Sequence, residues 1–435
     1  MKVACCRAIC RLRRQPTTVL ITVSLAIFID LLLYGLVLPV FPSVLQGKVD
    51  DVSVANAILG SCYALGTLVG SIVAGRLSDI LQRRQVLMCG GLALMMICTL
   101  ALGLCTTFWQ MILARLPQGL ASGVTWSLGF SMLADVYPEE KLGMVMGVVT
   151  GANVIGQMAG PGLGGLLYYA GGQYCPFAFG AGLTLVDLIF RVVVGETIHW
   201  REVSQSPAHA ISPGEPKSDI VSVRSLLGNW KVVVSCISTV GMTAIMAVID
   251  TLLPIHLEER FPNMNSAIIG AIFTALFLPM AIVSPLTGRA LDRWQPNLVW
   301  VTQGGLLLVS IVFPVLALPR TVILEVVVLV LFGIVTAVAL TPVTPLLSTV
   351  IDPKVCNSYG TVYGLYTVSS SLGLMVGPLF SVTVYQFSGF LSCTLLIASS
   401  TLALALIMVS VEVFLWRRAR KRVLNEDSDA ILTTP

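Results

Sequence analysis

The sequence predicts an all-α integral membrane protein with twelve transmembrane helices in two six-helix pseudo-repeats. Three observations support this fold class. Hydrophobic residues make up 56% of the 435 residues and charged residues only 11%, whereas soluble domains carry about 25% charged residues. Twelve apolar runs reach the length of about 20 residues that a helix needs to cross a bilayer core. Motifs of the first half also recur in the second half at a nearly constant offset.

The twelve predicted spans are joined by short connections, and the third and fourth are separated only at Thr106 to Trp109. Because a bilayer core offers the backbone no hydrogen-bond partners, each span is expected to be a helix. In chain order the spans are 17–41, 55–75, 86–106, 109–133, 144–168, 173–196, 230–253, 266–288, 298–318, 321–346, 359–384 and 388–415.

One longer polar segment separates the first six spans from the last six. It is rich in proline, serine and charged residues, a composition typical of a disordered linker. In the N-terminal tail, Cys5, Cys6 and Cys10 are candidates for palmitoylation, the alternative being reduced thiols. The predicted parts are a cytoplasmic tail 1–16, a six-helix bundle 17–196, a cytoplasmic linker 197–229, a second bundle 230–415 and a cytoplasmic tail 416–435.

Lysine and arginine are distributed unevenly between the two ends of the spans. With both termini in the cytoplasm, 21 of the 26 basic residues fall in cytoplasmic segments, and only Lys48, Arg260 and Arg320 fall in outer loops. Such a bias sets the orientation of membrane proteins. We therefore expect cytoplasmic termini, in a plasma or vacuolar membrane, with the basic loops facing anionic lipid and not nucleic acid.

Asp30 is a carboxylate near the middle of the first span. An ionised Asp at mid-membrane costs about 2.5 to 3.5 kcal/mol, so such residues usually face a cavity and mark an ion or substrate pathway. Desolvation acts against the charged form of a buried acid. Asp30 is therefore expected to take up and release protons or to act as counter-ion for a cationic substrate; the alternative is a carboxylate satisfied by neighbouring Ser or Tyr hydroxyls.

Other charged residues also fall within or near the spans. Arg115 lies in the outer third of the fourth span, from which its side chain could reach the outer headgroups. Asp187 and Arg191 stand four residues apart on one helix face and are expected to pair. Asp250 and Glu325 are expected near the outer ends of their spans, where water reaches them.

The two halves of the chain echo each other. Gly75 and Asp79 follow the second span, and Gly288 and Asp292 follow the eighth at an offset of 213. The pairs Gly160-Pro161 and Gly377-Pro378 repeat at an offset of 217. Duplicated units of this kind place a substrate site at mid-membrane, between the halves.

The loop after the second span is predicted to form a charged latch. Asp79 is expected to accept hydrogen bonds or to cap a neighbouring helix N-terminus, where the helix dipole favours an anion. Arg83 and Arg84 are expected to pair with Asp135 and so to hold the two halves together at the cytoplasmic side. The alternative is that these basic residues only set the orientation of the protein in the membrane. The corresponding residues of the second half are Gly288, Asp292 and Arg293.

Small residues recur every four positions in the fifth span. Ala152, Gly156, Gly160 and Gly164 share one helix face, and such faces let helix backbones approach closely. Pro161 removes a backbone hydrogen bond and favours a bend.

Taken together, these motifs resemble the major facilitator superfamily, and within it the twelve-span drug:proton antiporters, across nearly the whole chain. The loop Gly75-Arg-Leu-Ser-Asp79-Ile-Leu-Gln-Arg83-Arg84 is similar to G-x-L-x-D-R-x-G-R-R and departs from it at Ile80 and Gln82. The other resemblances are Arg115-Leu-Pro-Gln118-Gly119 to R-x-x-Q-G, Gly156-x-x-x-Gly160-Pro161-x-x-Gly164-Gly165 to the antiporter motif, and Asp30 followed nine residues later by Pro39.

The resemblance implies a major facilitator fold that works by alternating access. It implies a proton-coupling role for Asp30 and Arg115, and a packed, bendable fifth span that limits proton leak, for which tight packing alone is the alternative. The residues of this antiporter motif are Gly156, Gly160, Pro161, Gly164 and Gly165.

The segment Tyr359 to Tyr363 also resembles the vesicular amine transporter branch. That branch carries charged residues within its spans. The corresponding positions here are uncharged, namely Tyr63, Leu340 and Thr367. The resemblance therefore favours an exchanger with a single carboxylate and more hydrophobic substrates.

We expect a proton-coupled antiporter that exports hydrophobic or cationic small molecules such as drugs, toxins or secondary metabolites. It is expected to be a monomer in the bilayer and not an enzyme, with no cofactor or metal and the proton as coupling ion. The alternatives are an uptake symporter, a vesicular or vacuolar amine-type exchanger, and a non-transporting membrane sensor. Polar-tipped aromatic residues are expected to line the substrate cavity, namely Tyr34, Trp126, Tyr363 and Tyr366.

Overall fold

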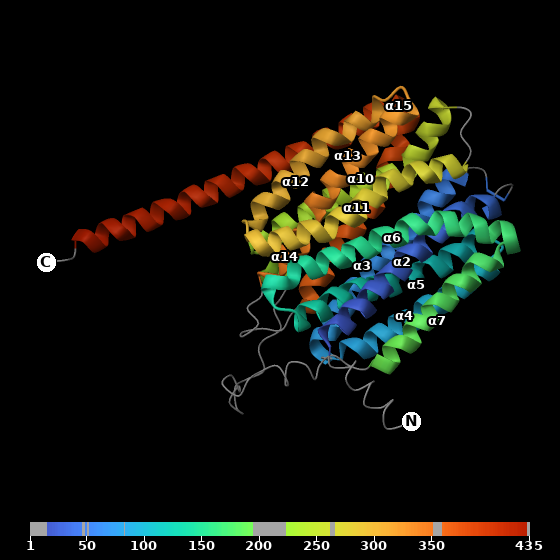
Figure 1. Cartoon of the computed structure of the whole chain (residues 1–435), viewed down its shortest axis with the longest axis horizontal. Helices are drawn as coiled ribbons and strands as arrows, with labels where there is room; N and C mark the ends of the chain where they lie inside the picture. Colours follow the sequence, from blue (N-terminus) through green and yellow to red (C-terminus); the bar gives the residue numbers. More distant parts are fainter. Residues whose placement is uncertain are drawn as a thin grey trace.

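The computed structural model describes residues 15–45, 48–49, 52–81, 83–194, 223–261, 266–350 and 359–432. The regular structure of these ranges is helical, and the long helices lie side by side in one bundle (Figure 1). Most of the predicted N-terminal tail, with Cys5, Cys6 and Cys10, and most of the predicted linker 197–229 lie outside the described residues.

Six helices form the first half of the bundle, and each corresponds to one predicted span. Most of them extend beyond the apolar run that predicted them, since a helix continues past the hydrocarbon core into the polar boundary. They are α2 (Pro16–Leu45), α3 (Val52–Leu81), α4 (Arg84–Leu104), α5 (Phe108–Val136), α6 (Glu139–Gly171) and α7 (Tyr174–Val194).

The second half repeats this plan with more interruptions. Gly389 has a non-helical backbone, with φ 74°, so α15 comprises two helices that meet at this glycine and correspond to the last two predicted spans. The second of them runs on to Leu432, beyond the predicted end at residue 415, and extends away from the bundle (Figure 1). The elements are α9 (Val223–Leu227), α10 (Trp230–Arg260), α11 (Ser266–Trp294), α12 (Leu298–Val312), η2 (Phe313–Ala317), α13 (Val322–Leu340), α14 (Val343–Ser348) and α15 (Tyr359–Leu432).

The membrane helices are consistent with the twelve predicted spans. Among the described residues, 10 helices are long and apolar enough to cross a membrane. The 29-residue α5 lies outside that group because its sequence is rich in polar and small residues, yet it packs within the bundle. Together with α5 and the division of α15 at Gly389, the structure is consistent with twelve spans, and the predicted all-α membrane fold is confirmed.

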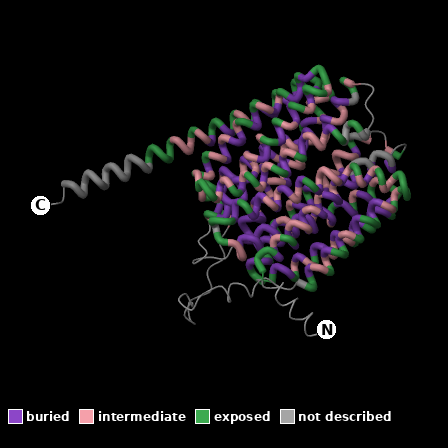
Figure 2. The backbone as a smooth tube through the Cα atoms, in the orientation of Figure 1, coloured by how far each residue is buried: buried purple, intermediate pink, exposed green. Residues whose placement is uncertain are grey.

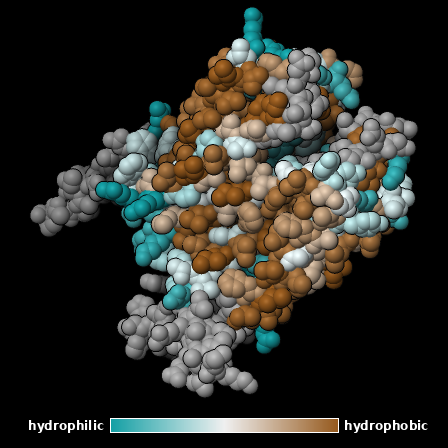
Figure 3. Space-filling model, turned by 45° about the vertical axis from the view of Figure 1, so that its right-hand side comes forward, coloured by the Kyte–Doolittle hydropathy of each residue, from teal (hydrophilic) through white to brown (hydrophobic). Residues whose placement is uncertain are grey.

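The helices pack in two groups that meet along two seams. In the first group α2 packs on α6 and α3 on α5, and in the second α10 packs on α15 and α11 on α13. The seams between the groups are formed by α3 with α15 and by α6 with α11. Buried residues lie in the interior (Figure 2), while many large apolar side chains are exposed on the outside, where Figure 3 shows extensive hydrophobic surface. An apolar exterior of this kind is suited to lipid.

Reciprocal glycines bring α3 and α5 into backbone contact. A methyl group at Gly119 would lie 3.0 Å from the Cα of Tyr63, and one at Gly66 would lie 2.9 Å from the backbone nitrogen of Leu120. Small residues at four-residue spacing permit such close approach. This contact sets Tyr63 of α3 beside Ser122 of α5.

Gly119→Ala is expected to destabilise the protein, because overpacking of a well-packed contact typically costs about 1 to 3 kcal/mol. Gly90→Ala in α4 is the matched control, since nothing lies within 4 Å of a methyl group there, and alanine is favoured over glycine in a helix by about 0.5 to 1 kcal/mol. Thermal unfolding of the purified protein should therefore show a lower Tm for Gly119→Ala and an equal or higher Tm for Gly90→Ala. Equal Tm values for the two variants would contradict this account of the α3–α5 contact.

Candidate functional site

Asp30 lies at the middle of α2, and its carboxylate is held by side chains from two other helices. Tyr63 of α3 donates its hydroxyl to Oδ1 at 3.0 Å. From α5, Ser122 donates to Oδ2 at 2.6 Å and the indole Nε1 of Trp126 donates to Oδ2 at 2.7 Å. Asp30 is only 2% exposed. The Ser and Tyr hydroxyl contacts that could satisfy the carboxylate are thus present. The indole N–H of Trp126 is an additional partner, and because it can only donate, it is suited to an anion.

Arg115 of α5 lies next to this cluster, among aromatic rings. It is buried, and its guanidinium carbon lies 4.9 Å from the centre of the Phe41 ring and 5.3 Å from that of Tyr63. Cations over aromatic faces are stabilised electrostatically. The Arg115 Nη1 also donates to Oε1 of Gln118 at 2.7 Å. Arg115 therefore does not reach outward to headgroups; Tyr63 links it to Asp30, with the ring beside the cation and the hydroxyl on the carboxylate.

A second carboxylate, the half-buried Asp250, lies in the other half. The Nε2 of Gln157 in α6 donates to Oδ2 of Asp250 in α10 at 2.8 Å, across the two halves. The Tyr34 ring is 5.3 Å from the Tyr63 ring, and the guanidinium carbon of Arg115 lies 6.0 Å from the centre of the Tyr34 ring. Tyr34 therefore belongs to the aromatic group around Arg115.

The predictions for two other acidic residues, Glu325 and Asp187, had different outcomes. The prediction that water reaches Glu325 is wrong: its side chain is fully buried, and neither carboxylate oxygen has a hydrogen-bond partner within the described structure. The reason is that Glu325 lies on the face of α13 that packs in the bundle, which has contacts to α11 and η2, whereas Ile323 and Leu324 beside it are exposed. The expected pair of Asp187 and Arg191 is confirmed at 4.0 Å, and Arg191 also donates to the Thr22 carbonyl at 2.7 Å.

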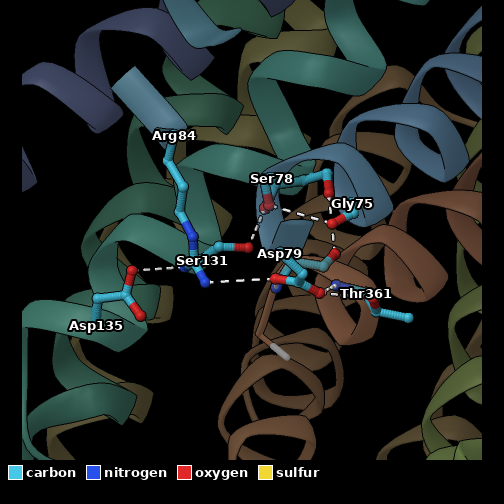
Figure 4. A network of polar contacts seen from close by, with 9 residues as sticks. Gly75, Ser78, Asp79, Arg84, Ser131, Asp135 and Thr361 are labelled. Atoms are coloured by element: carbon cyan, nitrogen blue, oxygen red, sulfur yellow. Dashed lines mark hydrogen bonds and ion pairs between the residues drawn. The ribbon is translucent and has the colours of Figure 1, made fainter. Parts of the chain in front are cut away.

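Asp79 was predicted in a loop, but α3 continues past it to Leu81, and the last turn of α3 contacts the other half through Asp79 (Figure 4). Its carboxylate accepts from the backbone N–H groups of Gly360 at 3.0 Å and Thr361 at 2.8 Å, and from the Thr361 hydroxyl at 2.6 Å. These are the second and third residues of α15, whose N–H groups have no partner inside the helix and whose dipole favours an anion. A methyl at Gly75 would lie 2.6 Å from the Gly360 carbonyl oxygen, so glycine is needed there.

The ion pairs beside Asp79 are formed by Arg84, the first residue of α4. Arg84 lies between two carboxylates, with Nη1 2.6 Å from Oδ2 of Asp135 and Nη2 3.6 Å from Oδ1 of Asp79 (Figure 4). Arg83 was predicted to share Asp135, but it is exposed and forms no ion pair within the described ranges. Arg83 precedes the first residue of α4 and has a non-helical backbone, and only Arg84 is buried at the seam.

The second seam repeats this arrangement in α11 and α6. Asp292 accepts from the backbone N–H groups of Gly143 at 2.9 Å and Met144 at 2.7 Å, in the first turns of α6. Gly288 packs against the Gly143 backbone. Arg293 is exposed, and no ion pair of it occurs in the part of the chain that is described. We call the end of the bundle that holds both contacts the latch end.

The glycine face of α6 packs on the helix that carries Asp30. Gly156, Gly160 and Gly164 meet the α2 backbone near Phe28, Leu32 and Leu36, while Gly165 faces open space. A methyl at Gly35 of α2 would lie 2.8 Å from Cδ of Pro161. Tight packing of the motif is therefore present at this helix pair.

The four predicted cavity aromatics lie in two groups. Tyr34 belongs to the Arg115 group described above. Phe130, which the sequence analysis missed, lies 5.6 Å from each of the rings of Trp126, Tyr363 and Tyr366. Tyr363 is fully buried, so these rings are packed together and only Trp126 reaches Asp30. In the described structure no group of three metal-ligating side chains occurs.

Comparison with known proteins agrees with this geometry. The sequence model of the Major Facilitator Superfamily matches residues 23–378 and 263–433. The chain is 31% identical to the MFS-type transporter ppzB of Metarhizium rileyi over 42% of its own length and 39% of that relative's. It is 24% identical to the vesicular acetylcholine transporter of Drosophila melanogaster over 89% of this chain and 70% of the relative. The crystal structure of the human organic anion transporter MFSD10 (TETRAN) is similar in fold, with TM-score 0.74 and 19% identity over 91% of this chain and 99% of that one.

Asp79→Asn is expected to loosen the latch end, because hydrogen bonds to a charged group contribute about 1.5 to 3 kcal/mol each. A cysteine at Ser127, which is fully buried and donates to the Gly360 carbonyl, reports the opening. In a Ser127→Cys background from which the native cysteines have been removed, maleimide labelling should accelerate by at least about tenfold when Asp79 is replaced. Arg83→Gln, at an exposed position between α3 and α4, is the matched control. An unchanged labelling rate in Asp79→Asn would refute the latch role.

Proposed function

Because the chain belongs to the Major Facilitator Superfamily of multi-pass membrane transporters, we propose that it is a proton-coupled antiporter for hydrophobic or cationic small molecules. Asp30 is its coupling carboxylate. The observation that carries the proposal is the position of Asp30 in mid-helix, with donors from α3 and α5 on both of its oxygens. A relative named as a vesicular acetylcholine transporter supports a cationic substrate.

The geometry around Asp30 suits an exchange of proton for cation. Tyr63, Ser122 and Trp126 orient the ionised carboxylate, so an ammonium group can approach it with little reorganisation. When Asp30 takes up a proton, its charge is lost, and with it the attraction for a cation. A carboxylate that holds either a proton or a cation, but not both, couples their movements in opposite directions.

Arg115 and Tyr63 extend this coupling beyond the carboxylate. Tyr63 lies between the guanidinium and Asp30, so protonation of Asp30 weakens both the hydrogen bond from Tyr63 and the attraction of Arg115 to the site. Because Asp30 belongs to α2 and Arg115 to α5, the change in charge alters how strongly these helices attract each other. This gives protonation a mechanical consequence within the first half.

Asp250 supplies a contact from the second half. Its bond to Gln157 joins α10 to α6, so opening between the halves must break this bond or replace it. A cationic substrate that reaches both Asp30 and Asp250 would compensate for the loss. We therefore assign Asp250 to substrate binding and to the change between the two access states, with the latches at Asp79 and Asp292 closing the cytoplasmic side.

The driving force follows from the charge moved. Each elementary charge crossing the membrane is worth about 2.3 kcal/mol per 100 mV, so proton entry can drive substrate export without ATP. In this proposal both termini lie in the cytoplasm, and the protein is a monomer in the plasma, vacuolar or vesicular membrane. It needs no cofactor besides the proton. An uptake symporter or a membrane sensor would not exchange substrate for protons.

Asp30→Asn is expected to abolish proton-driven transport, since an amide neither binds a proton nor attracts a cation. Vesicles containing the purified protein are given an acidic interior, and uptake of a fluorescent lipophilic cation is followed. The wild type should accumulate the probe and lose it when a protonophore is added, while Asp30→Asn should match empty vesicles. Glu140→Gln, the same kind of change at an exposed position in the first turn of α6, should transport normally. Gradient-driven accumulation by Asp30→Asn would rule Asp30 out as the coupling site.

Asp250→Asn is expected to weaken binding of cations more than it slows turnover, because it removes a charge from the binding side and leaves Asp30 intact. The apparent KM for the cation should rise by about tenfold, which corresponds to about 1.4 kcal/mol. Initial rates measured over a concentration series separate KM from the maximal rate. A KM equal to that of the wild type would remove Asp250 from the proposed binding site.

A further inference from the structure

The far end of the second half, opposite the latch end, contains a cavity that the transport mechanism does not use. Its volume is about 660 Å³, within the range of about 300 to 1,000 Å³ typical of small-molecule sites. Three segments surround it: the end of α10, the turn between η2 and α13, and the turn at Gly389 in α15. Its principal lining residues are His256, Glu259, Arg260, Arg320, Tyr385 and Phe390.

The charges that line this cavity are predominantly positive. Arg260 and Arg320 both border it, and neither forms an ion pair with a carboxylate among the residues described. Glu259 is the one carboxylate among the principal lining residues, and it already accepts a hydrogen bond from the Tyr385 hydroxyl. The two guanidinium groups are therefore available to an anion.

One wall of the cavity is flat and aromatic. The rings of His256 and Phe390 are stacked, with their centres 4.1 Å apart and their planes at 14°. His256 is only 8% exposed, yet its Nε2 has no hydrogen-bond partner in the described structure. Buried polar atoms are normally paired. The imidazole is held by its stack on Phe390, and the two rings give the cavity an aromatic lining.

We propose that this cavity is an accessory site for a small aromatic carboxylate. The carboxylate would bind to the guanidinium groups of Arg260 and Arg320, which match its planar geometry. The ring of the ligand would lie against the stacked pair of His256 and Phe390, an arrangement that aromatic groups favour. The site is separate from Asp30, selects the opposite charge, and does not depend on the proposed antiport.

Occupation of this site would affect the helix that carries Asp250. His256 and Arg260 belong to the last turns of α10, while Phe390 belongs to α15. A ligand that contacts both segments fixes the end of α10 against the turn at Gly389. The accessory site is thus placed to change the transport rate without competing for the substrate site.

The test uses the full-length protein in lipid nanodiscs, with benzoate as the probe. Isothermal titration at constant ionic strength should show saturable binding of benzoate, several-fold weaker binding of acetate, and no saturable binding of benzamide at the same concentrations. Arg260→Gln and Arg320→Gln should each weaken benzoate binding by at least about tenfold, because each removes a charged hydrogen-bond donor. Arg289→Gln, at an exposed arginine of the latch end, should leave binding unchanged.

Three results would overturn the proposal. They are the lack of saturable benzoate binding to the wild type, equal affinity in both cavity variants and the control, and binding of benzamide as tight as that of benzoate. Thermal unfolding of each variant verifies that it is folded, and His256→Ala provides a second route: it should reduce the preference for benzoate over acetate while acetate binding persists. A preference unchanged in His256→Ala would contradict the assigned aromatic wall.

Discussion

The burial of Asp30 in the middle of a membrane helix is the constraint on which the rest of the structure depends. An ionised carboxylate at that depth costs about 2.5 to 3.5 kcal/mol, and hydrogen bonds from Tyr63, Ser122 and Trp126 offset this cost. Those donors reach Asp30 only because α3 and α5 approach closely at their glycines. The packing of small residues is therefore part of the chemistry of the site.

The two latches show how duplicated halves close against each other. Asp79 and Asp292 occupy equivalent places, and each accepts hydrogen bonds from two successive backbone N–H groups at the start of a helix in the opposite half. They differ in their support: Arg84 lies between Asp79 and Asp135, whereas Arg293 is exposed. The α3–α15 contact is thus the more strongly charged of the two, and Asp79 is the more deeply buried carboxylate.

The sequence predicted the fold well because span length and apolar composition are local properties. It also identified Asp30, since a single carboxylate in an apolar run is visible without any structure. The partners of these residues were harder to predict. Thr361 lies 282 positions from Asp79, and only the folded chain shows that they meet. The expectation for Glu325 failed because closeness to the end of a span says nothing about which elements cover it. Tyr63 was noted only as a position without the embedded charge of the vesicular amine branch, although its hydroxyl reaches Asp30.

Direct detection of proton movement tests the central role of Asp30 most clearly. Vesicles that contain the protein and a pH-sensitive dye are held without an imposed gradient, and a lipophilic cation is then added outside. Coupled exchange predicts that cation entry alkalinises the dye as protons leave the vesicle, and that Asp30→Asn eliminates this signal while Glu140→Gln preserves it. Cation entry without a proton signal in the wild type, or a proton signal that persists in Asp30→Asn, would contradict the account.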